Sequence, residues 1–289
     1  MSVPTYKWSY FITISLLIFL ANLEIAAAQN KLTIGVFPRH NYAETIRMFL
    51  PLEKYLTNKL GMPVKIESAR DFEHFWSNIE TKKYDLVHVN QSQYLNAHKR
   101  FGYNILLKNE EFGQSTLRSI IVVRKDSGIN SLNDLKNKKI IFGGNKTAMM
   151  SYLIPNKLLN DAGISKDKIN VSFARNPPNA LMAVYIKQAD ACGIGDAVLK
   201  LTKIKNNIDT DKIKIIAKSE AVPHLAWATA KSMSDALQKK VRMYLLALND
   251  TSEGKKILSR ARLTGLLPVA HQEYKGLGKY LQTGKDTKP

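Results

Sequence analysis

A glycine-rich turn lies between two apolar segments of the sequence, at GGNKT (residues 143–147). A helix that begins after such a turn presents free backbone amides and the positive end of its dipole, which together favour an anion. The turn lacks the G-x-x-x-x-G-K-[ST] spacing of a phosphate loop, so we exclude nucleotide hydrolysis. Two interpretations remain. Gly144, Lys146 and Thr147 could form an anion site, or the turn could simply carry a solvated lysine.

A second group of polar residues follows the first expected strand. Arg39, His40 and Tyr42 stand together in this loop. The guanidinium of Arg39 can bind a carboxylate or a phosphate through two parallel hydrogen bonds. An arginine exposed on a loop is the alternative. Because the loop follows a strand of an expected α/β sheet, we expect at least one of the three residues to contact a ligand.

Further polar residues follow later strands. Asn90 and Gln91 begin one expected helix, and Asn176 and Asn179 flank two prolines at the start of another. Asp196 follows a third strand. Capping a helix is the alternative role for the asparagines, because Asn is a preferred N-cap residue. We expect all five residues to line a ligand site.

No group of residues predicts catalysis or a bound metal. The chain has no His-Glu-x-x-His motif, and Cys192 is its single cysteine, which excludes an intramolecular disulfide. His74, His88 and His98 do not have metal-ligand spacing, and spacing alone indicates no nucleophile with its base. We therefore expect no enzymatic activity, no metal and no cofactor.

Short apolar runs alternate with amphipathic stretches along most of the chain, which is typical of an α/β fold with parallel strands. Expected strands cover residues 32–36, 64–66, 84–89, 119–125, 138–142, 170–174, 192–194 and 212–217. Expected helices cover residues 43–60, 71–80, 91–100 and 179–188, and residues 232–281 are expected to be helical. Ligands bind such sheets beyond the carboxyl ends of the strands, where the polar loops stand.

The two ends of the chain and its charge concern its location and partners. Residues 1–28 predict an export signal to the periplasm, with an apolar core and cleavage before Gln29, although an uncleaved anchor is the alternative. Residues 282–289 predict a flexible tail.

Lys and Arg number 43 against 24 Asp and Glu, a formal net charge of +19. This excess indicates either a generally cationic surface that aids solubility or attraction of an anionic partner such as a ligand, a membrane or nucleic acid. No zinc-finger or RNA-binding signature supports nucleic acid.

Several motifs resemble those of a known family and stand in its order. They are LTIGVFP (32–38), PLEKYLTNKLGMPVKI (51–66), YDLVHVNQSQY (84–94), VRKDSGINSLNDLKNKKI (123–140), YLIPNKLLNDAGI (152–164), ALMAVYIKQADACGIGDAVL (180–199), VPH (222–224) and EY (273–274). The chain resembles the periplasmic solute-binding proteins of phosphate, phosphite and phosphonate ABC transporters over residues 32–281.

The resemblance implies a two-lobed type II periplasmic binding protein fold, with two mixed α/β sheets flanked by helices and joined by two crossover strands. Lobe 1 would comprise residues 29–118 and 218–281, and lobe 2 residues 119–217. The protein would capture a small ligand, an oxyanion such as phosphonate or phosphate, between the lobes. It would deliver this ligand to the membrane permease of an ABC transporter. We expect it to act as a monomer.

The sequence departs from the family pattern where the family grips its anion. Phosphonate-binding members carry Ser-Thr-Ser-Gly before the YL-x-P segment, whereas this chain has AMMS (148–151). Residues 176–179 replace the family's usual His, and either Gly195 or Asp196 stands at its binding Asp. A small organic acid is therefore the second candidate ligand. The alternative function is a periplasmic ligand sensor or scaffold acting in trans with a membrane kinase or a redox partner.

Overall fold

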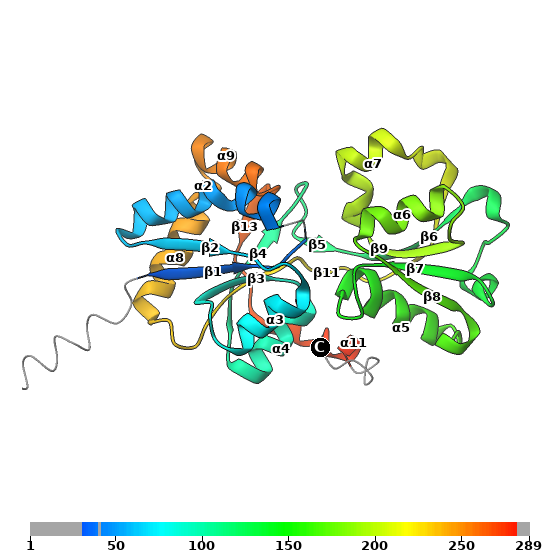
Figure 1. Cartoon of the computed structure of the whole chain (residues 1–289), viewed down its shortest axis with the longest axis horizontal. Helices are drawn as coiled ribbons and strands as arrows, with labels where there is room; N and C mark the ends of the chain where they lie inside the picture. The colour runs from blue at the N-terminus through cyan, green and yellow to red at the C-terminus, as the bar shows by residue number, and fades with distance from the viewer. Residues whose placement is uncertain (1–30, 40–41, 282–289) are drawn as a thin grey trace, which may run out of the picture.

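In the computed structural model, the chain forms two lobes side by side, each built around its own sheet (Figure 1). The structure describes residues 31–39 and 42–281. The expected signal at residues 1–28, the cleavage site at Gln29 and the expected tail at residues 282–289 lie outside the described residues. Two mixed sheets flanked by helices confirm the predicted fold class.

The first lobe contains a six-stranded sheet in the order β13-β4-β12-β3-β1-β2. Its strands are β1 (Leu32–Val36), β2 (Val64–Glu67), β3 (Leu86–Val89), β4 (Asn104–Glu110), β12 (Ala226–Thr229) and β13 (Gly265–Leu267). β1 runs parallel to β2 and β3. β12 runs antiparallel to β3 and β4, and β13 antiparallel to β4. The sheet is therefore parallel at one edge and antiparallel at the other.

Helices cover both faces of the first sheet (Figure 1). They are α2 (Tyr42–Leu60), α3 (Phe72–Glu80), α4 (Gln91–Phe101), α8 (Asp235–Ala247), α9 (Ser252–Arg260) and α10 (His271–Lys275). The last helix, α11 (Gly278–Leu281), contacts α4 and residues 149–153 of the second lobe. α4 is bounded by clear signals. The Asn90 side chain accepts from the Gln93 amide at its start, and Gly102 ends it in the left-handed region at φ 73°. These signals fix where α4 begins, beside the predicted site.

The second lobe contains a five-stranded sheet in the order β10-β6-β9-β7-β8. Its strands are β6 (Ser119–Arg124), β7 (Lys139–Gly143), β8 (Asn170–Ala174), β9 (Ala191–Gly195) and β10 (Ile213–Lys218). β7 is parallel to β8 and β9, whereas β6 is antiparallel to β9 and β10. The helices are α5 (Ile154–Asp161), α6 (Pro177–Tyr185) and α7 (Thr202–Asn207). A π-helical turn at Met149–Leu153 leads into α5.

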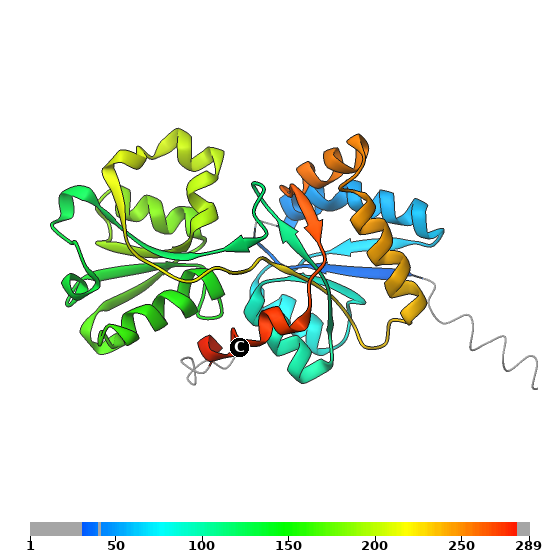
Figure 2. The same cartoon turned by 180° about the vertical axis from the view of Figure 1, so that it is seen from behind.

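Two neighbouring connections join the lobes (Figure 2). The short strand β5 (Thr116–Leu117) pairs antiparallel with β11 (Val222–Pro223). Next to this pair, the Ser219 amide donates to the Ser119 carbonyl at 2.9 Å, and the Ser119 amide donates to Ser219 Oγ at 2.9 Å. The two crossings therefore hold each other in register. The exact boundaries of the lobes stay a prediction.

Two expectations about secondary structure are wrong. Residues 232–281 are not helical throughout, because β13 lies within them and pairs with β4. The strands β4 and β12 are not anticipated at all. The antiparallel partners of β4, β6, β10, β12 and β13 agree with the mixed sheets that the resemblance implies. Strands as short as β12 and β13 offer too few alternating positions to be recognised, and their pairing partners stabilise them instead.

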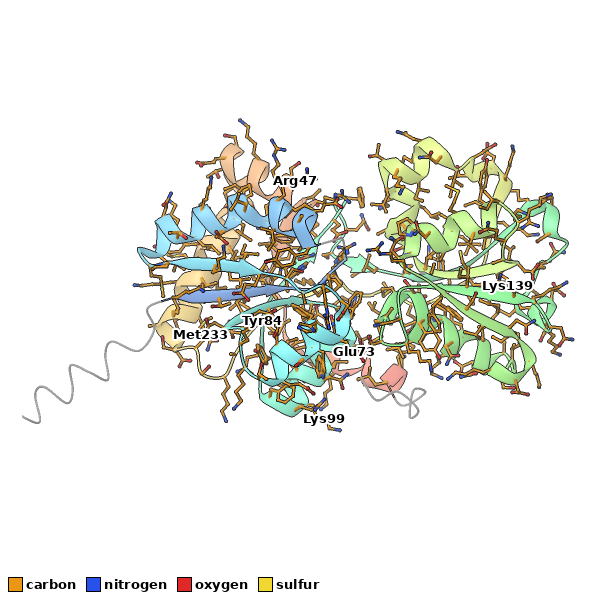
Figure 3. All side chains as sticks on the ribbon, viewed as in Figure 1. Arg47, Glu73, Tyr84, Lys99, Lys139 and Met233 are labelled. Atoms are coloured by element: carbon orange, nitrogen blue, oxygen red, sulfur yellow. The ribbon has the colours of Figure 1, made fainter. Side chains whose placement is uncertain are left out.

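The outer surfaces of both lobes carry many charged side chains. Arg47 on α2, Lys99 on α4 and Lys139 on β7 are exposed examples (Figure 3). No helix within the described ranges is long and apolar enough to cross a membrane.

Candidate ligand-binding site

The predicted polar loops meet where the two lobes face each other. Ser92 begins α4 in the first lobe, and Thr147 belongs to the glycine-rich turn after β7 in the second. Ser92 Oγ donates to the Thr147 carbonyl oxygen at 2.6 Å. The two residues are 55 positions apart in the chain. The fold therefore brings the start of α4 against the glycine-rich turn across the interlobe cleft.

A polar cavity of about 60 Å³ lies beside this cleft. One wall comes from residues 111–118 at the end of β4 and along the first crossover, and the other from residues 196–200 after β9. The charged residues of its lining are Glu111, Arg118, Asp196 and Lys200. The volume can hold a few water molecules or a small polar group. Both lobes contribute charged groups to one small space.

Arg39 is ion-paired in the structure. Its Nη1 donates to Glu111 Oε1 at 2.7 Å, and the side chains of Arg39 and Glu111 are 43% and 5% exposed. Burial acts to raise the pKa of Glu111, but the adjacent Arg39 guanidinium holds that pKa at about 2. Glu111 is therefore ionised at neutral pH. Part of the Arg39 guanidinium is occupied before any ligand arrives.

His88 belongs to a buried side-chain network beneath this pair. Trp227 Nε1 donates to Asn109 Oδ1 at 2.8 Å, which turns the Asn109 amide nitrogen toward His88 Nε2 at 3.0 Å. The His88 and Trp227 rings stack with centroids 4.6 Å apart. Burial, reinforced by the charge of Arg39, lowers the pKa of His88 to about 3. The neutral ring therefore carries its proton on Nδ1, which has no partner among the described residues.

His224 lies in the second crossover and is also neutral. The Leu225 amide donates to His224 Nδ1 at 2.8 Å, so the ring proton is on Nε2. Burial lowers the pKa of His224 to about 4. Nε2 is 3.9 Å from Glu111 Oε2, too far for a hydrogen bond. Gln91 is similar, because its amide nitrogen donates to the Pro223 carbonyl at 2.8 Å while its Oε1 has no hydrogen-bond partner in the described part of the chain.

The glycine-rich turn satisfies most of its own polar groups. Gly144 has φ 103°, a conformation that favours glycine. Asn145 Oδ1 accepts from the Thr147 amide at 3.0 Å and from Thr147 Oγ1 at 2.8 Å. Lys146 is exposed and makes no hydrogen bond or ion pair with any described residue. Both interpretations of the turn are compatible with this geometry, and the anion site stays a prediction.

The other predicted residues of the second lobe have structural partners. Asn176 Oδ1 accepts from the Asn179 amide at 3.0 Å and so caps α6, while Asn179 is exposed. Asp196 Oδ1 accepts from the Arg118 amide at 3.1 Å, and its own amide donates to the Arg118 carbonyl at 2.8 Å. Asn90 caps α4 in the same way as Asn176 caps α6. Capping therefore accounts for two asparagines, and their ligand roles stay predictions.

Two residues of the loop after β1 add little to the geometry. Tyr42 is the first residue of α2 and is 52% exposed. His40 lies outside the described residues.

As for metals, no group of three or more His, Cys, Asp or Glu within residues 31–39 and 42–281 could hold an ion. His98 stacks on His271 with ring centroids 4.0 Å apart, and His74 is exposed.

The sequence reasoning does not find Glu111 and Asn109. Both depend on β4, which it does not predict, so the residues at the carboxyl end of that strand are never considered. The usable signal is a run of polar and acidic residues after NILLK (104–108), a short and mainly apolar segment. Ser92 follows Asn90 and Gln91 in the same predicted loop, and only the structure shows its contact with the second lobe. His224 is predicted to pack structurally, and its unpaired Nε2 shows a donor that the sequence does not reveal.

These features can be compared with known proteins. A sequence model of the family described as "ABC transporter, phosphonate, periplasmic substrate-binding protein" matches residues 34–274. The chain belongs to this family. Members are periplasmic binding proteins that bind a small ligand and work with an ABC transporter. The match spans both lobes and both crossovers, so the whole two-lobed unit is shared with the family.

Individual relatives are distant. The phosphonates-binding periplasmic protein of Escherichia coli is 24% identical over 241 residues, covering 80% of this chain and 70% of that protein. The tetrathionate sensor histidine kinase of Salmonella typhimurium is also 24% identical, over 231 residues, covering 72% of this chain but only 38% of the kinase. The chain therefore matches less than half of the kinase.

Solved structures with this fold agree over most of both chains. A Xanthomonas citri protein bound to ATP has a TM-score of 0.78 at 18% identity, covering 90% of this chain and all of that one. A Prochlorococcus marinus protein in complex with methylphosphonate has a TM-score of 0.75 at 19% identity, covering 88% of this chain and 98% of that one. At these identities the likeness concerns the fold.

The departure from the family pattern lies in the π-helical turn before α5. Met149, Met150 and Ser151 are 1%, 9% and 4% exposed. Met149 and Met150 belong to an apolar cluster with members from both lobes, including Tyr94 and Tyr274. Where phosphonate-binding members carry hydroxyl groups, this chain has two buried methionines that pack between the lobes.

Proposed function

We propose that the protein is exported to the periplasm, captures a small anionic ligand in the interlobe cleft and delivers it to the permease of an ABC transporter. The observation that supports this most is the hydrogen bond between Ser92 and Thr147, because it joins loops of the two lobes. Residues of both lobes also line a small charged cavity. No bond is made or broken in this function. The favoured ligand is an oxyanion such as a phosphonate or phosphate.

Lobe closure provides the mechanism. The crossovers are paired side by side, so rotation about them can move the lobes without disrupting either sheet. Closing the cleft around a ligand excludes water and strengthens each polar contact inside it. Arg39, Lys146 and the backbone amides near Thr147 would contact the anion, while Arg118 and Lys200 make the neighbouring cavity electropositive in part.

Three lines of support favour an oxyanion. The Escherichia coli relative is named for phosphonates, and the Prochlorococcus marinus structure contains methylphosphonate. The Xanthomonas citri structure contains ATP, whose phosphates are also oxyanions. The net charge of +19 steers anions toward the protein in general. The buried methionines at residues 149 and 150 leave a small organic acid as the second candidate ligand.

A thermal shift screen of the protein purified after export tests the ligand class. The panel contains phosphate, phosphite, methylphosphonate, sulfate, tetrathionate, ATP, carboxylates and amino acids. A ligand at 100 times its dissociation constant adds about 2.7 kcal/mol. For a chain of this size that is a rise in Tm of roughly 5 to 10 °C. A shift with carboxylates and none with any phosphorus oxyanion would sink the oxyanion assignment.

The relation to the tetrathionate sensor kinase favours one alternative, a periplasmic sensor that signals in trans. A Tm shift with tetrathionate and none with phosphorus oxyanions would support it. The transport role is tested with the permease and ATPase of an ABC transporter from the same organism. Ligand-loaded protein should stimulate ATP hydrolysis by that transporter in proteoliposomes, and no stimulation would count against delivery.

A further inference from the structure

Glu111 and His224 lie close together without a hydrogen bond between them. The distance between Glu111 Oε2 and His224 Nε2 is 3.9 Å, beyond hydrogen-bond range. Glu111 Oε1 is held by Arg39 Nη1 at 2.7 Å, whereas Oε2 accepts no hydrogen bond from any described residue. His224 Nε2 is buried and likewise has no hydrogen-bond partner among the described residues. The side chains of Glu111 and His224 are 5% and 1% exposed.

The hydrogen-bonding character of both atoms is fixed. Glu111 is ionised beside Arg39, so its Oε2 can only accept. His224 Nδ1 is occupied by the Leu225 amide, so Nε2 of the neutral ring can only donate. Buried polar atoms are rarely left unpaired, because an unmade hydrogen bond costs the full desolvation of the group. The gap therefore suits a group that accepts from one side and donates to the other.

Few chemical groups meet this requirement. A fully ionised oxygen can accept from His224, but it has no proton for Glu111 and is repelled by that carboxylate. An ammonium group can donate to Glu111, but it cannot accept from His224. A hydroxyl group does both at once. Glu111 also lines the interlobe cavity, to which residues of both lobes contribute.

We propose that Glu111 and His224 form a subsite for a protonated oxygen of the ligand. On this basis the cleft selects oxyanions that keep an O–H group, such as hydrogenphosphate or a phosphonate monoanion, over sulfate, which has none at neutral pH. The inference rests on the proposed oxyanion-binding function and adds a rule of selection to it. Glu111 and His224 are then specificity-determining residues outside the family's usual anion-gripping turn.

The electrostatic surroundings fit this assignment. The charged or titratable groups near Glu111 are Arg39, His88 and His224, and its cavity also contains Arg118, Asp196 and Lys200. Arg39 neutralises Glu111, so the carboxylate does not repel a monoanion from the cleft as a whole. It disfavours only an ionised oxygen placed directly against Oε2. A water molecule in the gap would satisfy the same two atoms, and the test must separate these cases.

The experiment is isothermal titration of the exported protein with methylphosphonate, phosphate and sulfate. We expect methylphosphonate to bind on the order of 10- to 100-fold more tightly than sulfate, the effect of leaving one buried charged partner unpaired. Phosphate-type groups lose their last proton near neutrality, at about pH 6 for an ester. The affinity for methylphosphonate should therefore fall as the pH is raised through the second ionisation of that ligand.

Two variants and one control separate the subsite from general electrostatics. In Glu111→Gln the amide can donate to an ionised oxygen. The preference for methylphosphonate over sulfate should therefore shrink about tenfold, and the affinity for methylphosphonate should depend less on pH. His224→Asn keeps an acceptor near the Leu225 amide but lacks the Nε2 donor, and it should weaken methylphosphonate binding about tenfold. The control is Glu110→Gln, since Glu110 bonds Thr264 Oγ1 outside the cavity. This control should change neither the preference for methylphosphonate over sulfate nor the pH dependence of methylphosphonate binding.

The outcomes are distinguishable. If oxyanions bind, but sulfate matches methylphosphonate and Glu111→Gln behaves as the wild type, the gap holds water and the subsite is refuted while oxyanion binding stands. If no oxyanion binds at any pH, the proposed ligand class fails and the subsite fails with it. If Glu110→Gln changes the preference as much as Glu111→Gln, the effect is long-range charge, and the subsite is again refuted.

Discussion

The two faces of the cleft are stabilised in different ways. On the first-lobe face, side chains far apart in the chain bond one another, as in Arg39–Glu111 at a separation of 72 residues and Trp227–Asn109 at 118. On the second-lobe face, polar side chains bond backbone two or three residues away, as Asn145 and Asn176 do. The first face is built mainly from buried, long-range pairs. The second relies on local turns and caps at the glycine-rich turn and the start of α6, with Asp196, which accepts from the Arg118 amide 78 residues away, as the exception.

The difference indicates a division of roles. Buried networks hold their members in one arrangement, because any displacement leaves polar groups unpaired. Local turns keep their hydrogen bonds when they move as units, and their outer side chains, such as Lys146, remain in solvent. We infer that the first face is preorganised for selection, whereas the second moves with lobe closure and completes the contacts. Four predictions test this comparison.

The largest expected effect is acid destabilisation of the first face. Histidines titrate ordinarily at 6.5, but folded His88 and His224 titrate at about 3 and about 4. Between pH 6.5 and these lower pKa values, the unfolded state therefore binds more protons than the folded state. The free energy of unfolding falls as the pH is lowered through this window. From pH 7 to about 4.5 the loss should be roughly 5 kcal/mol, measured by urea unfolding. His88→Gln should remove about half of the pH dependence, and an unchanged dependence would contradict this account.

Breaking the network at its centre should cost nearly as much. Asn109→Ala leaves Trp227 Nε1 and His88 Nε2 without partners in a buried site. Each unsatisfied group costs about 1 to 3 kcal/mol, so we expect a loss of roughly 3 to 4 kcal/mol in urea unfolding. The matched control is Asn145→Ala on the second face, where only local bonds are lost, at a cost of about 1 kcal/mol. Equal losses would remove the distinction between the faces.

One position on the second face should be sensitive for a steric reason. A Cβ atom at Gly143 would lie 2.3 Å from Pro177 Cα, at the start of α6. Gly143→Ala must therefore separate β7 from α6, at a cost of roughly 2 to 3 kcal/mol. Gly276→Ala is the control, since its Cβ would meet nothing within 4 Å. It should be neutral or slightly stabilising, and similar melting temperatures for the two variants would refute the steric argument.

The smallest effect concerns the contact between the faces. Ser92→Ala removes the hydrogen bond to the Thr147 carbonyl, which should weaken ligand binding about three- to tenfold by calorimetry. Ser68→Ala is matched to it, because Ser68 Oγ donates to the Val36 carbonyl within the first lobe at 2.8 Å. It should lower stability by a similar amount and leave affinity unchanged. Equal affinity losses in both variants would mean that the Ser92 contact has no special part in closure.

Much of the fold can be predicted from local pattern. The first strand, α2, α3 and α4 lie within two residues of their expected bounds, because each has clear apolar periodicity and a capping residue or a glycine at an end. The antiparallel strands β12 and β13 could not be predicted. They have four and three residues, and they are strands because β4 lies beside them.

The candidate site divides in a similar way. The sequence indicates Arg39, Asn90 and Thr147, because polar residues after strands of an α/β sheet are exposed at one edge. It does not indicate that Arg39 is paired with Glu111, because their contact joins the loops after β1 and β4 across five intervening elements. Nor does it show that the start of α4 bonds the glycine-rich turn.

What the sequence determined by itself is therefore the alternation of elements, the excess of positive charge and the set of polar loops. These follow from periodicity, composition and capping, which act over a few residues. The tertiary structure alone decided which polar atoms are buried, which are paired and which are left without a partner. Burial and pairing depend on neighbours that are 50 or more residues away in the chain, as in Tyr274–His224 and Ser119–Ser219, and no local pattern records them.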